Sequence, residues 1–539
     1  MDQFCSSRRC FSFLICITIL CVRSEAHKSA HKSAVVTNGI ECSNIAKDIL
    51  KKGGSAADAA VSALLCEGVT CPQSTGLGGD MAPLAATENM FDDETEVTGG
   101  KAIAVPGELK GYWELHQKYG KLDWSELFDP VIKLCRKGHI VSPHLDIVLS
   151  KHKEHIKKSP SFKEIYVNPD TNDIYKEGDF MKQHKLADTL EIIQNEGADS
   201  MYNNGTVAQM IVQDIQDAGG IVTVEDLMKY NVRWEEPIEA QLKDNKKLYT
   251  VPLPSGGPPL VFIMNVLHEY LPEEESAIAF HRMAEAFKFA YAHRSELGDD
   301  KFHKESINLM KKFTDIDFAR EIRRRILDNE TFTDHVYYGA KFAHKDDYGT
   351  SNINILAPNG DAISVTATIN NEFGSKILSE QTGIVLNNGM DDFSIPGAAN
   401  SYGLSPSPSN YIEPQKMPLS SMCPSILLDK DNNVELLIGA AGGSKITTSV
   451  AYALLRYLNF DESIVDAVRA PRIHHQLTPN RLEHEFGCSE EIIDGLSNIG
   501  HEMYKCVPDG FCALTAIGQS CGKLTTVLDP RNHGMLPVY

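Results

Sequence analysis

Alternating apolar and polar residues in the second half of the chain predict a β-hairpin. In residues 350–370, which read TSNINILAPNGDAISVTATIN, every isoleucine falls on an odd-numbered position, as expected for two strands with one buried face. Pairing Ile355 with Ile363 sets the register and leaves a three-residue loop, 358–360. Gly360 can take the left-handed conformation that such loops favour.

The same register brings three polar side chains to one end of the hairpin. Thr350, the first residue of the first strand, lies opposite Thr368, and Asn370 points to the same side. Facing residues on paired strands have Cβ atoms about 4.5 to 5.5 Å apart. Because Gly349 precedes Thr350, a cut between them would make Thr350 an N-terminal nucleophile with polar partners beside it; without a cut, Thr350 is only a surface hydroxyl.

Helical patterns predominate before residue 350. A helix over 43–52 ends at a glycine pair, and Ser55 with Asp58 can cap the alanine-rich helix that follows. An antiparallel helix pair would bring Cys42 near Cys66, which predicts a disulfide, the alternative being two buried thiols. Apolar residues at i, i+3, i+4 and i+7 predict a core-facing helix over 280–291.

A strand, a glycine turn and a helix are predicted over residues 434–459. Gly442 and Gly443 form the turn, and the helix starts near Ile446. The segment does not fit a phosphate loop because Ser444 stands where that motif needs glycine. Backbone N–H groups at such a turn suit an anionic oxygen. The alternative is a tight turn that needs glycine only for its backbone angles.

Composition excludes some classes of protein. With 42% hydrophobic and 23% charged residues the 539-residue chain is globular, and a net charge of −21 argues against a nucleic-acid partner. No CxxC pair or HExxH helix occurs, so neither a metal site nor a cofactor is predicted.

The N-terminus predicts secretory entry. Arg8 and Arg9 precede a 13-residue apolar run, 10–22, and a small-x-small triplet follows at 24–26. This run suits a signal peptide and is short for a membrane span. We therefore expect residues 1–26 to be a signal peptide or an uncleaved signal anchor and the protein to be extracellular, with sequons at Asn204 and Asn329 as candidate glycan sites.

Eight motifs in order resemble the γ-glutamyltranspeptidase (glutathione hydrolase) family. They are GGSAADAAVSALLC, AVPGELKGYWELHQKYG, DDYGT, TINNEFGS, NNGMDDF, PLSSMCPS, GAAGGSKITTS and PRIHHQL, and they run from about residue 40 to the end of the chain. The resemblance implies an α+β fold, the four-layer αββα sandwich of N-terminal nucleophile hydrolases. It also implies self-cleavage into a large subunit, 27–349, and a small subunit, 350–539, which stay associated.

The resemblance also implies a mechanism and site residues. The freed Thr350 hydroxyl would attack the γ-glutamyl amide of glutathione or a conjugate, with its own α-amine as base, and water, an amino acid or a dipeptide would accept the γ-glutamyl group. Thr368 would assist Thr350, and Gly442 and Gly443 would form the oxyanion hole. The donor's α-amino and α-carboxyl groups would be held by Asn370, Asp392, Ser420 and Ser421.

Three positions depart from the family pattern. A strand-length segment ending in a carboxylate-binding arginine has no counterpart after GLGGD (76–80), Gly389 replaces an acidic or amide residue, and Asn352 replaces a histidine. Each lost charge-assisted bond is worth about 1.5 to 3 kcal/mol, so losing both substrate contacts predicts a fall of roughly 10² to 10⁴ in kcat/KM. A weakened extracellular enzyme, a secreted pseudoenzyme that binds a ligand, and an acylase for another amide are the three hypotheses.

Overall fold

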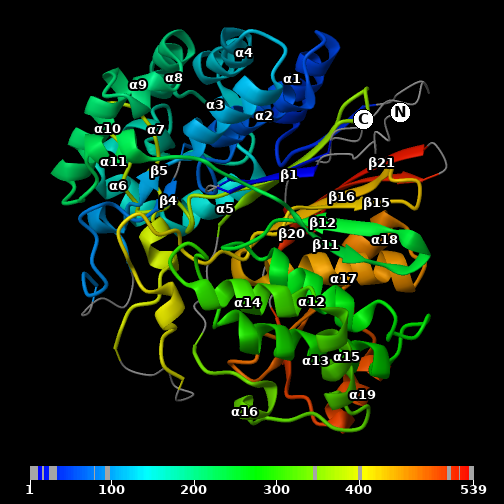
Figure 1. Cartoon of the computed structure of the whole chain (residues 1–539). Helices are drawn as coiled ribbons and strands as arrows, with labels where there is room; N and C mark the ends of the chain where they lie inside the picture. Colours follow the sequence, from blue (N-terminus) through cyan, green and yellow to red (C-terminus); the bar gives the residue numbers. More distant parts are fainter. Residues whose placement is uncertain are drawn as a thin grey trace, which may run out of the picture.

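Two six-stranded antiparallel sheets form the middle of the molecule (Figure 1). The computed structural model describes residues 10–14, 17–22, 33–77, 79–91, 97–343, 349–397, 404–506, 511–520 and 523–532. The first sheet has the order β10 (Arg233–Glu235), β1 (Cys10–Leu14), β2 (Ile17–Val22), β14 (Ala362–Ala367), β13 (Ser351–Leu356), β3 (Ala34–Val36). The second has the order β11 (Ile238–Gln241), β12 (Lys247–Thr250), β15 (Ser425–Leu428), β16 (Val434–Ala441), β20 (Ala513–Ser520), β21 (Lys523–Leu528).

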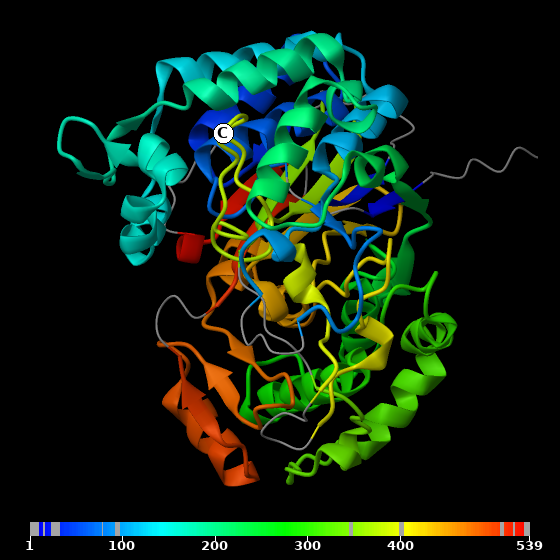
Figure 2. The same cartoon turned by 90° about the vertical axis from the view of Figure 1, so that its left-hand side faces the viewer.

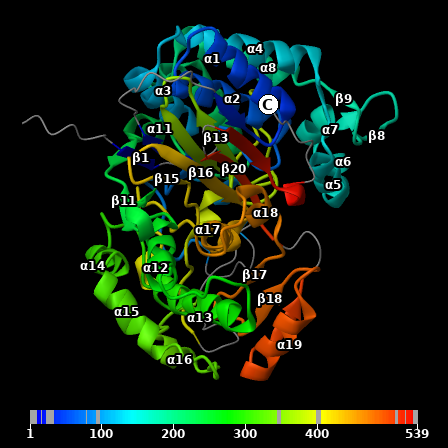
Figure 3. The same cartoon turned by 90° about the vertical axis from the view of Figure 1, so that its right-hand side faces the viewer.

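Helices cover the outer face of each sheet (Figure 3). The first sheet is covered by α1 (Ile40–Lys51), α2 (Ala56–Thr70), α3 (Glu108–Tyr119) and α4 (Trp124–Lys137), with α8 (His184–Glu196) beyond them. The second is covered by α12 (Gly257–Leu267), α13 (Ala277–Arg294) and α17 (Ile446–Asn459). This order of layers confirms the predicted αββα sandwich.

Shorter elements surround these four layers. One lobe, which projects beside the first helical layer (Figures 2 and 3), contains α5 (Pro143–Lys151), α6 (Lys153–Lys158), α7 (Pro160–Tyr166), β6 (His139–Ile140), β7 (Val167–Asn168), β8 (Asp173–Ile174) and β9 (Phe180–Met181). The remaining helices are α9 (Asp199–Tyr202), α10 (Thr206–Asp217), α11 (Val224–Lys229), α14 (Lys304–Phe313), α15 (Ile316–Arg325), α16 (His335–Tyr338), α18 (Ile464–Arg469) and α19 (Glu490–Ile499). The remaining strands are β4 (Gly79–Met81), β5 (Val105–Pro106), β17 (Ile473–His474), β18 (Leu482–His484) and β19 (Met503–Lys505).

The predicted hairpin has the predicted register. Ile355 pairs with Ile363 in β13 and β14, and the Ala357 N–H donates to the Asp361 carbonyl at 2.8 Å. Gly360 has a φ of +84°. The three-residue loop and its left-handed glycine are therefore confirmed.

The prediction that this hairpin has only one buried face is wrong. Its isoleucines pack under the helices of the first layer, but its polar side chains are also buried, because they face the second sheet. Asn354 donates to Thr515 Oγ1 at 2.8 Å, and Thr515 Oγ1 in turn donates to Asn352 Oδ1. An alternating pattern usually indicates that the polar face is exposed to water. Here, hydrogen bonds between the two sheets take the place of hydrogen bonds to water.

The predicted helix pair and its disulfide are confirmed. The side chains of Ser55 and Asp58 form a complete capping box at the start of α2, and Cys42 in α1 is bonded to Cys66 in α2. The predicted stripe over 280–291 lies in α13, and its apolar residues are buried.

Removing the disulfide should lower thermal stability. The bond joins residues separated by 24 positions, and closing a loop of this size stabilises a fold by about 3 kcal/mol. We expect the Cys42→Ala/Cys66→Ala variant to show a midpoint of thermal inactivation several degrees lower than wild type. Cys135→Ala, which removes a buried cysteine without a disulfide, is the control, and an equal fall in both variants would contradict a stabilising role for the bond.

A hairpin from the N-terminal segment fills a place in the first sheet. Strand β2 pairs with all six residues of β14, and β1 pairs with β10. Leu20 and Val22 are buried between the two sheets. Strand β4, which begins at the last glycine of the run at 76–79, pairs with β5 outside this sheet. Strand β2, which belongs to the run that the sequence assigns to a leader, thus covers the edge of β14, while the triplet at 24–26 lies outside the described residues.

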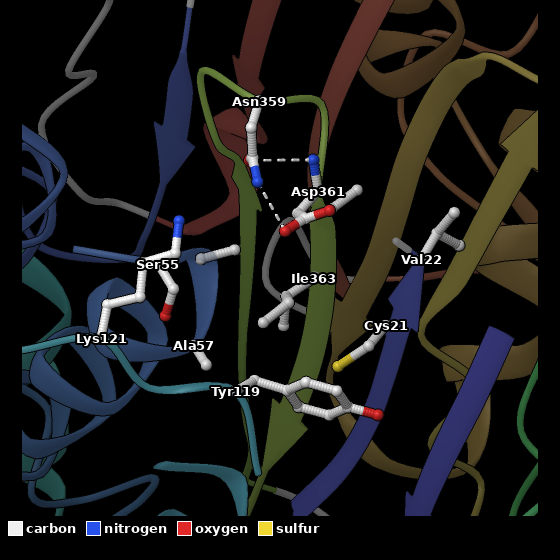
Figure 4. A pocket seen from close by; sticks show the side chains of 11 residues that line it. Cys21, Val22, Ser55, Ala57, Tyr119, Lys121, Asn359, Asp361 and Ile363 are labelled. Atoms are coloured by element: carbon white, nitrogen blue, oxygen red, sulfur yellow. Dashed lines mark hydrogen bonds between the residues drawn. The ribbon is translucent and has the colours of Figure 1, made fainter. Parts of the chain in front are cut away.

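The end of β2 lies beside a small cavity (Figure 4). Cys21 and Val22 line this cavity of about 60 Å³ together with Tyr119 and the hairpin loop. At the loop, Asn359 donates to Asp361 at 2.7 Å. None of the predicted site residues lines this cavity, so it is a packing gap where β2 meets the first helical layer.

Both sheets combine strands from before and after Thr350. The first contains β3 and β10 beside β13 and β14, and the second contains β11 and β12 beside β15 and β16. A cut before Thr350 would therefore leave two chains that share both sheets, although the predicted subunit boundary itself stays a prediction. Among the described residues, no helix has the length and apolar character to cross a membrane.

Buried histidines should make the protein less stable in acid. Burial lowers the pKa of His139 from 6.5 to about 4, and its neutral ring contacts Gln183. The unfolded chain therefore binds a proton below pH 6.5 that the folded chain does not, so stability falls as pH falls from 6.5 towards 4, by up to about 1.4 kcal/mol per pH unit. We expect thermal inactivation midpoints to fall from pH 7 to pH 5, and less steeply in His139→Gln. The variant of an exposed histidine, His184→Gln, should match wild type; equal slopes in all three proteins would count against His139.

Candidate active site

Two threonine hydroxyls converge on the carbonyl of Gly349. Thr350 Oγ1 contacts the Gly349 oxygen and lies 3.4 Å from Thr368 Oγ1. Thr368 Oγ1 donates to the same carbonyl at 3.0 Å and accepts from the N–H of Asn370 at 2.9 Å. The structure therefore brings Thr350, Thr368 and Asn370 together as the hairpin register predicts.

Backbone geometry at Gly349 requires glycine. Its φ is +105°, and a Cβ at this position would lie 2.4 Å from the carbonyl oxygen of Asn370. A side chain here would displace the hairpin end that carries Thr368. The glycine thus allows the peptide bond before Thr350 to lie against the hydroxyl groups.

A cavity of about 210 Å³ contains Thr350, Gly349 and Gly442 in its lining. Gly442 and Gly443 have φ values of +134° and +67°, and the chain turns there from β16 into α17. The predicted glycine turn therefore lies beside Thr350. An oxyanion hole needs backbone N–H groups close to the reacting carbonyl, and a turn without side chains allows the backbone to come that close to the cavity.

Charged groups at this cavity are already paired. Arg531 binds Glu485 and lies 2.8 Å from Asp529 Oδ1. Burial raises the pKa of Glu372, but hydrogen bonds from His152 and Lys151 outweigh burial and hold it at about 2. Neither Arg531 nor Glu372 therefore offers an uncompensated charge to a substrate.

Asn410 joins the segments that carry the predicted donor-binding residues. Its Nδ2 donates to the carbonyl of Asp392 at 2.8 Å, and its Oδ1 accepts from the N–H of Leu419, next to Ser420, at 2.9 Å. Asn370 Nδ2 donates to the carbonyl of Asn388 at 3.1 Å. Because Asn388 immediately precedes the turn that contains Asp392, this bond connects the threonine pair with the predicted donor-binding segment.

Ser421 is held from two elements. Its Oγ accepts from Arg294 Nη2 at 2.8 Å, and its carbonyl accepts from Thr447 Oγ1 at 3.2 Å. Gly256 lies so close that a Cβ there would be 2.3 Å from the Ser421 oxygen. Ser421 is therefore fixed by hydrogen bonds from α13 and α17 and lies against Gly256, at the start of α12.

Two of the departures from the family pattern have different structural consequences. Asn352 is buried and bonded to Thr366 and Thr515, so it fills a position between the sheets rather than in the Thr350 cavity. Gly389 is buried at the start of a turn, where its N–H donates to Asn387 at 2.9 Å. Only Gly389 removes a side chain from the predicted donor site.

Sequence reasoning missed three positioning residues, Glu67, Arg294 and Asn410. Glu67 Oε2 accepts from Ser351 Oγ at 3.0 Å. Burial raises its pKa, opposed by hydrogen bonds from Asn38, Ser351 and Gly39. Its signal was a carboxylate in the apolar part of α2, where the other carboxylate, Asp58, already belongs to the capping box. Arg294 and Asn410 lack any local signal, because their partners are distant in sequence.

One described cluster has the residue types of a metal site. His281, Glu285 and His501 are buried within 4.8 Å of one another. Their atoms already make hydrogen bonds, because His281 Nδ1 contacts His501 Nε2 at 2.8 Å and Tyr338 donates to Glu285 at 2.8 Å. The Lys288 ammonium, 3.2 Å from Glu285, supplies the positive charge. We assign this cluster to the core.

Together, the four-layer sandwich and a threonine at the start of a central strand define an N-terminal nucleophile hydrolase. The sequence model of the family described as gamma-glutamyltranspeptidase matches residues 42–82 and 80–539. The chain therefore belongs to the gamma-glutamyltranspeptidase family.

Individual relatives agree with this assignment. The chain is 38% identical to "Scoloptoxin SSD14" of Scolopendra dehaani, covering 93% of this chain and 92% of the relative. It is 37% identical to "Glutathione hydrolase 2" of Arabidopsis thaliana, covering 95% and 94%. The crystal structure of a cephalosporin acylase from Bacillus halodurans matches with a TM-score of 0.80 at 20% identity, covering 100% of this chain and 98% of that one, and shows the fold alone.

Proposed function

We propose that the chain cuts itself before Thr350 and then hydrolyses or transfers γ-glutamyl groups from glutathione and its conjugates. The observation that carries this proposal is the convergence of Thr350 and Thr368 on the Gly349 carbonyl, 3.0 Å from Thr368 Oγ1, beside the cavity that Gly442 lines. The names of the relatives support the substrate.

The proposed self-cleavage uses this geometry. Thr350 Oγ1 attacks the Gly349 carbonyl carbon, the C–N bond breaks, and the departing nitrogen takes the hydroxyl proton, which leaves an ester. Thr368 stabilises the oxygen that becomes negative during the attack. Water then hydrolyses the ester, which leaves a carboxylate on Gly349 and a free α-amine on Thr350.

The new α-amine gives Thr350 a base as well as a nucleophile. Its reference pKa is about 7.7 to 8.0, so a substantial neutral fraction is present near pH 7 to accept the hydroxyl proton. Attack on the γ-carbonyl gives a γ-glutamyl ester and releases the amine product. Water, an amino acid or a dipeptide then takes the acyl group.

The absence of the family arginine and of a side chain at Gly389 supports a second candidate, a pseudoenzyme with a binding role. A denaturing gel separates the two. We expect a small fragment of 190 residues beginning TSNIN, and release of the aniline from a γ-glutamyl anilide. An uncut chain without activity would overturn the enzyme proposal.

Extracellular location is a separate proposal, supported by the apolar N-terminal run and by the Cys42–Cys66 disulfide. N-terminal sequencing of the large fragment tests how the run is used. A start after Ala26 supports a cleaved leader and leaves the β14 edge without β2. A start at Met1 in protein retained by the cells contradicts secretion through a cleaved leader.

A further inference from the structure

A buried carboxylate without a positive partner binds the residue that follows Thr350. Glu67, in the last turn of α2, is fully buried, and its Oε2 accepts from Ser351 Oγ at 3.0 Å. Its Oε1 accepts from the N–H groups of Asn38 at 2.8 Å and Gly39 at 3.2 Å. Among the described residues, no Lys, Arg or His nitrogen lies within ion-pair distance of this carboxylate. Burying a charge without a counter-ion is costly, so the site calls for a cation.

The hydrogen bonds around Glu67 fit an ionised carboxylate. The two backbone N–H groups can only donate, and Asn38 Nδ2 donates a further bond at 3.2 Å. Burial raises the pKa of Glu67, and these bonds oppose that effect. A carboxylate that accepts several N–H bonds is favoured in its charged form. The surroundings therefore suit a negative charge at this position.

Two other carboxylates of the core show the usual arrangement. Asp299 is fully buried and binds Arg233 at 2.6 Å, and Asp529, which is almost as buried, binds Arg472. Buried charges in proteins are normally paired in this way. Glu67 has no such cation in the described part of the chain, but the proposed self-cleavage would create one next to Ser351, the α-ammonium group of Thr350.

We propose that Glu67 provides the negative charge for the α-ammonium group of Thr350 and, through Ser351, positions that group at the cavity. Asn38 donates to both Glu67 and Ser351, and it lines the cavity together with Thr350. The interaction arises only after the cut, because an uncut chain has a neutral peptide nitrogen at this position. The proposal rests on the proposed function and deepens it.

The other titratable groups around this region do not replace this charge. They are Glu41 in the first turn of α1, Cys71 at the end of α2, His144 on α5, Glu372 after β14, and Arg531 near the C-terminus. Burial and the charge of Glu67 raise the pKa of the Cys71 thiol well above its usual range, so this thiol stays neutral. Arg531 and Glu372 are bound to partners of opposite charge, and His144 contacts Gln73 at 3.1 Å.

The pH dependence of catalysis tests this inference. A negative charge near the α-amine favours its protonated form, so the neutral base appears at a higher pH than it would without Glu67. The rise of kcat/KM with pH reports this titration in the free enzyme. In Glu67→Gln, which removes the charge and keeps the shape, we expect the midpoint of the rise to move to lower pH by about one unit, measured with a γ-glutamyl anilide. The donor's own α-amino group titrates equally in both assays, so the difference belongs to the enzyme.

Two variants separate the charge from its surroundings. Glu41→Gln is the matched control, because it removes a carboxylate from the neighbouring helix, and its midpoint should equal that of wild type. Glu67→Asp keeps the charge and should also stay close to the wild-type midpoint. Lower activity in Glu67→Gln with an unmoved midpoint would show a purely structural role and overturn the inference.

A further variant covers a failure of Glu67→Gln to fold. Glu67→Leu places an apolar side chain in the apolar part of α2, where replacing a buried charge by a hydrophobic group is often tolerated. Its midpoint should move in the same direction as expected for Glu67→Gln. An unmoved midpoint in Glu67→Leu would overturn the inference.

Self-cleavage distinguishes this inference from the proposed function. Because the α-ammonium group forms only after the cut, Glu67→Gln should still yield the fragment beginning TSNIN. A folded but uncut Glu67→Gln would place Glu67 in self-cleavage itself and overturn the inference. A cut, active wild type with the same midpoint as Glu67→Gln overturns the role of Glu67 and leaves the proposed function intact, whereas an uncut, inactive wild type overturns both.

Discussion

Replacing Thr350 by alanine should leave the chain uncut and without activity. The variant removes the hydroxyl that contacts the Gly349 carbonyl, so the attacking group for self-cleavage and the nucleophile for the substrate are lost together. We expect a single full-length band and γ-glutamyl anilide hydrolysis at least ~10³-fold below wild type. The fold should persist, because the methyl group of alanine keeps the start of β13 filled.

Two variants show whether the loss is specific to this hydroxyl. Thr350→Ser keeps a hydroxyl, so it should be cut and active, more slowly than wild type. Thr333→Ala removes an exposed threonine and should behave as wild type. A Thr350→Ala chain that is still cut at the same bond, or still active, would show that another residue is the nucleophile.

The sequence predicts the local part of this site well. The alternation in 350–370 sets the pairing of β13 with β14, and that pairing places Thr350 opposite Thr368 because strand register is a repeating geometric rule. The capping box of Ser55 and the turn at Gly442 are likewise local, since each depends on residues within a few positions of one another.

Contacts between distant segments could not be predicted in this way. Arg294 and Ser421 are 127 positions apart, and only the packing of α13 behind the serine segment makes them neighbours. The burial of the polar face of β13 could not be predicted for the same reason. Alternation shows that Asn352 and Asn354 share a face, but it does not show whether water or a second sheet lies opposite. The strand role of residues 10–22 is hidden because an apolar run of this length suits both a leader and a buried hairpin.

Converting Gly442 to alanine should slow catalysis while leaving self-cleavage nearly intact. A Cβ at this position would lie 2.8 Å from Cys512 Sγ and 2.9 Å from its Cα, and the φ of +134° is one that alanine rarely adopts. The turn must therefore move away from Thr350. Losing one oxyanion donor costs about 10² to 10³ in kcat, and we expect a fall of that size in anilide hydrolysis.

Self-cleavage should respond differently, because the Gly349 carbonyl accepts its hydrogen bond from Thr368 and not from this turn. A gel of Gly442→Ala should thus show the fragment beginning TSNIN. The control is Gly178→Ala, which places alanine at a φ of +85° with nothing within 4 Å and should retain wild-type kcat. If Gly442→Ala keeps full kcat, the glycines serve only the conformation of the turn. Groups other than this turn must then stabilise the negative charge of the intermediate.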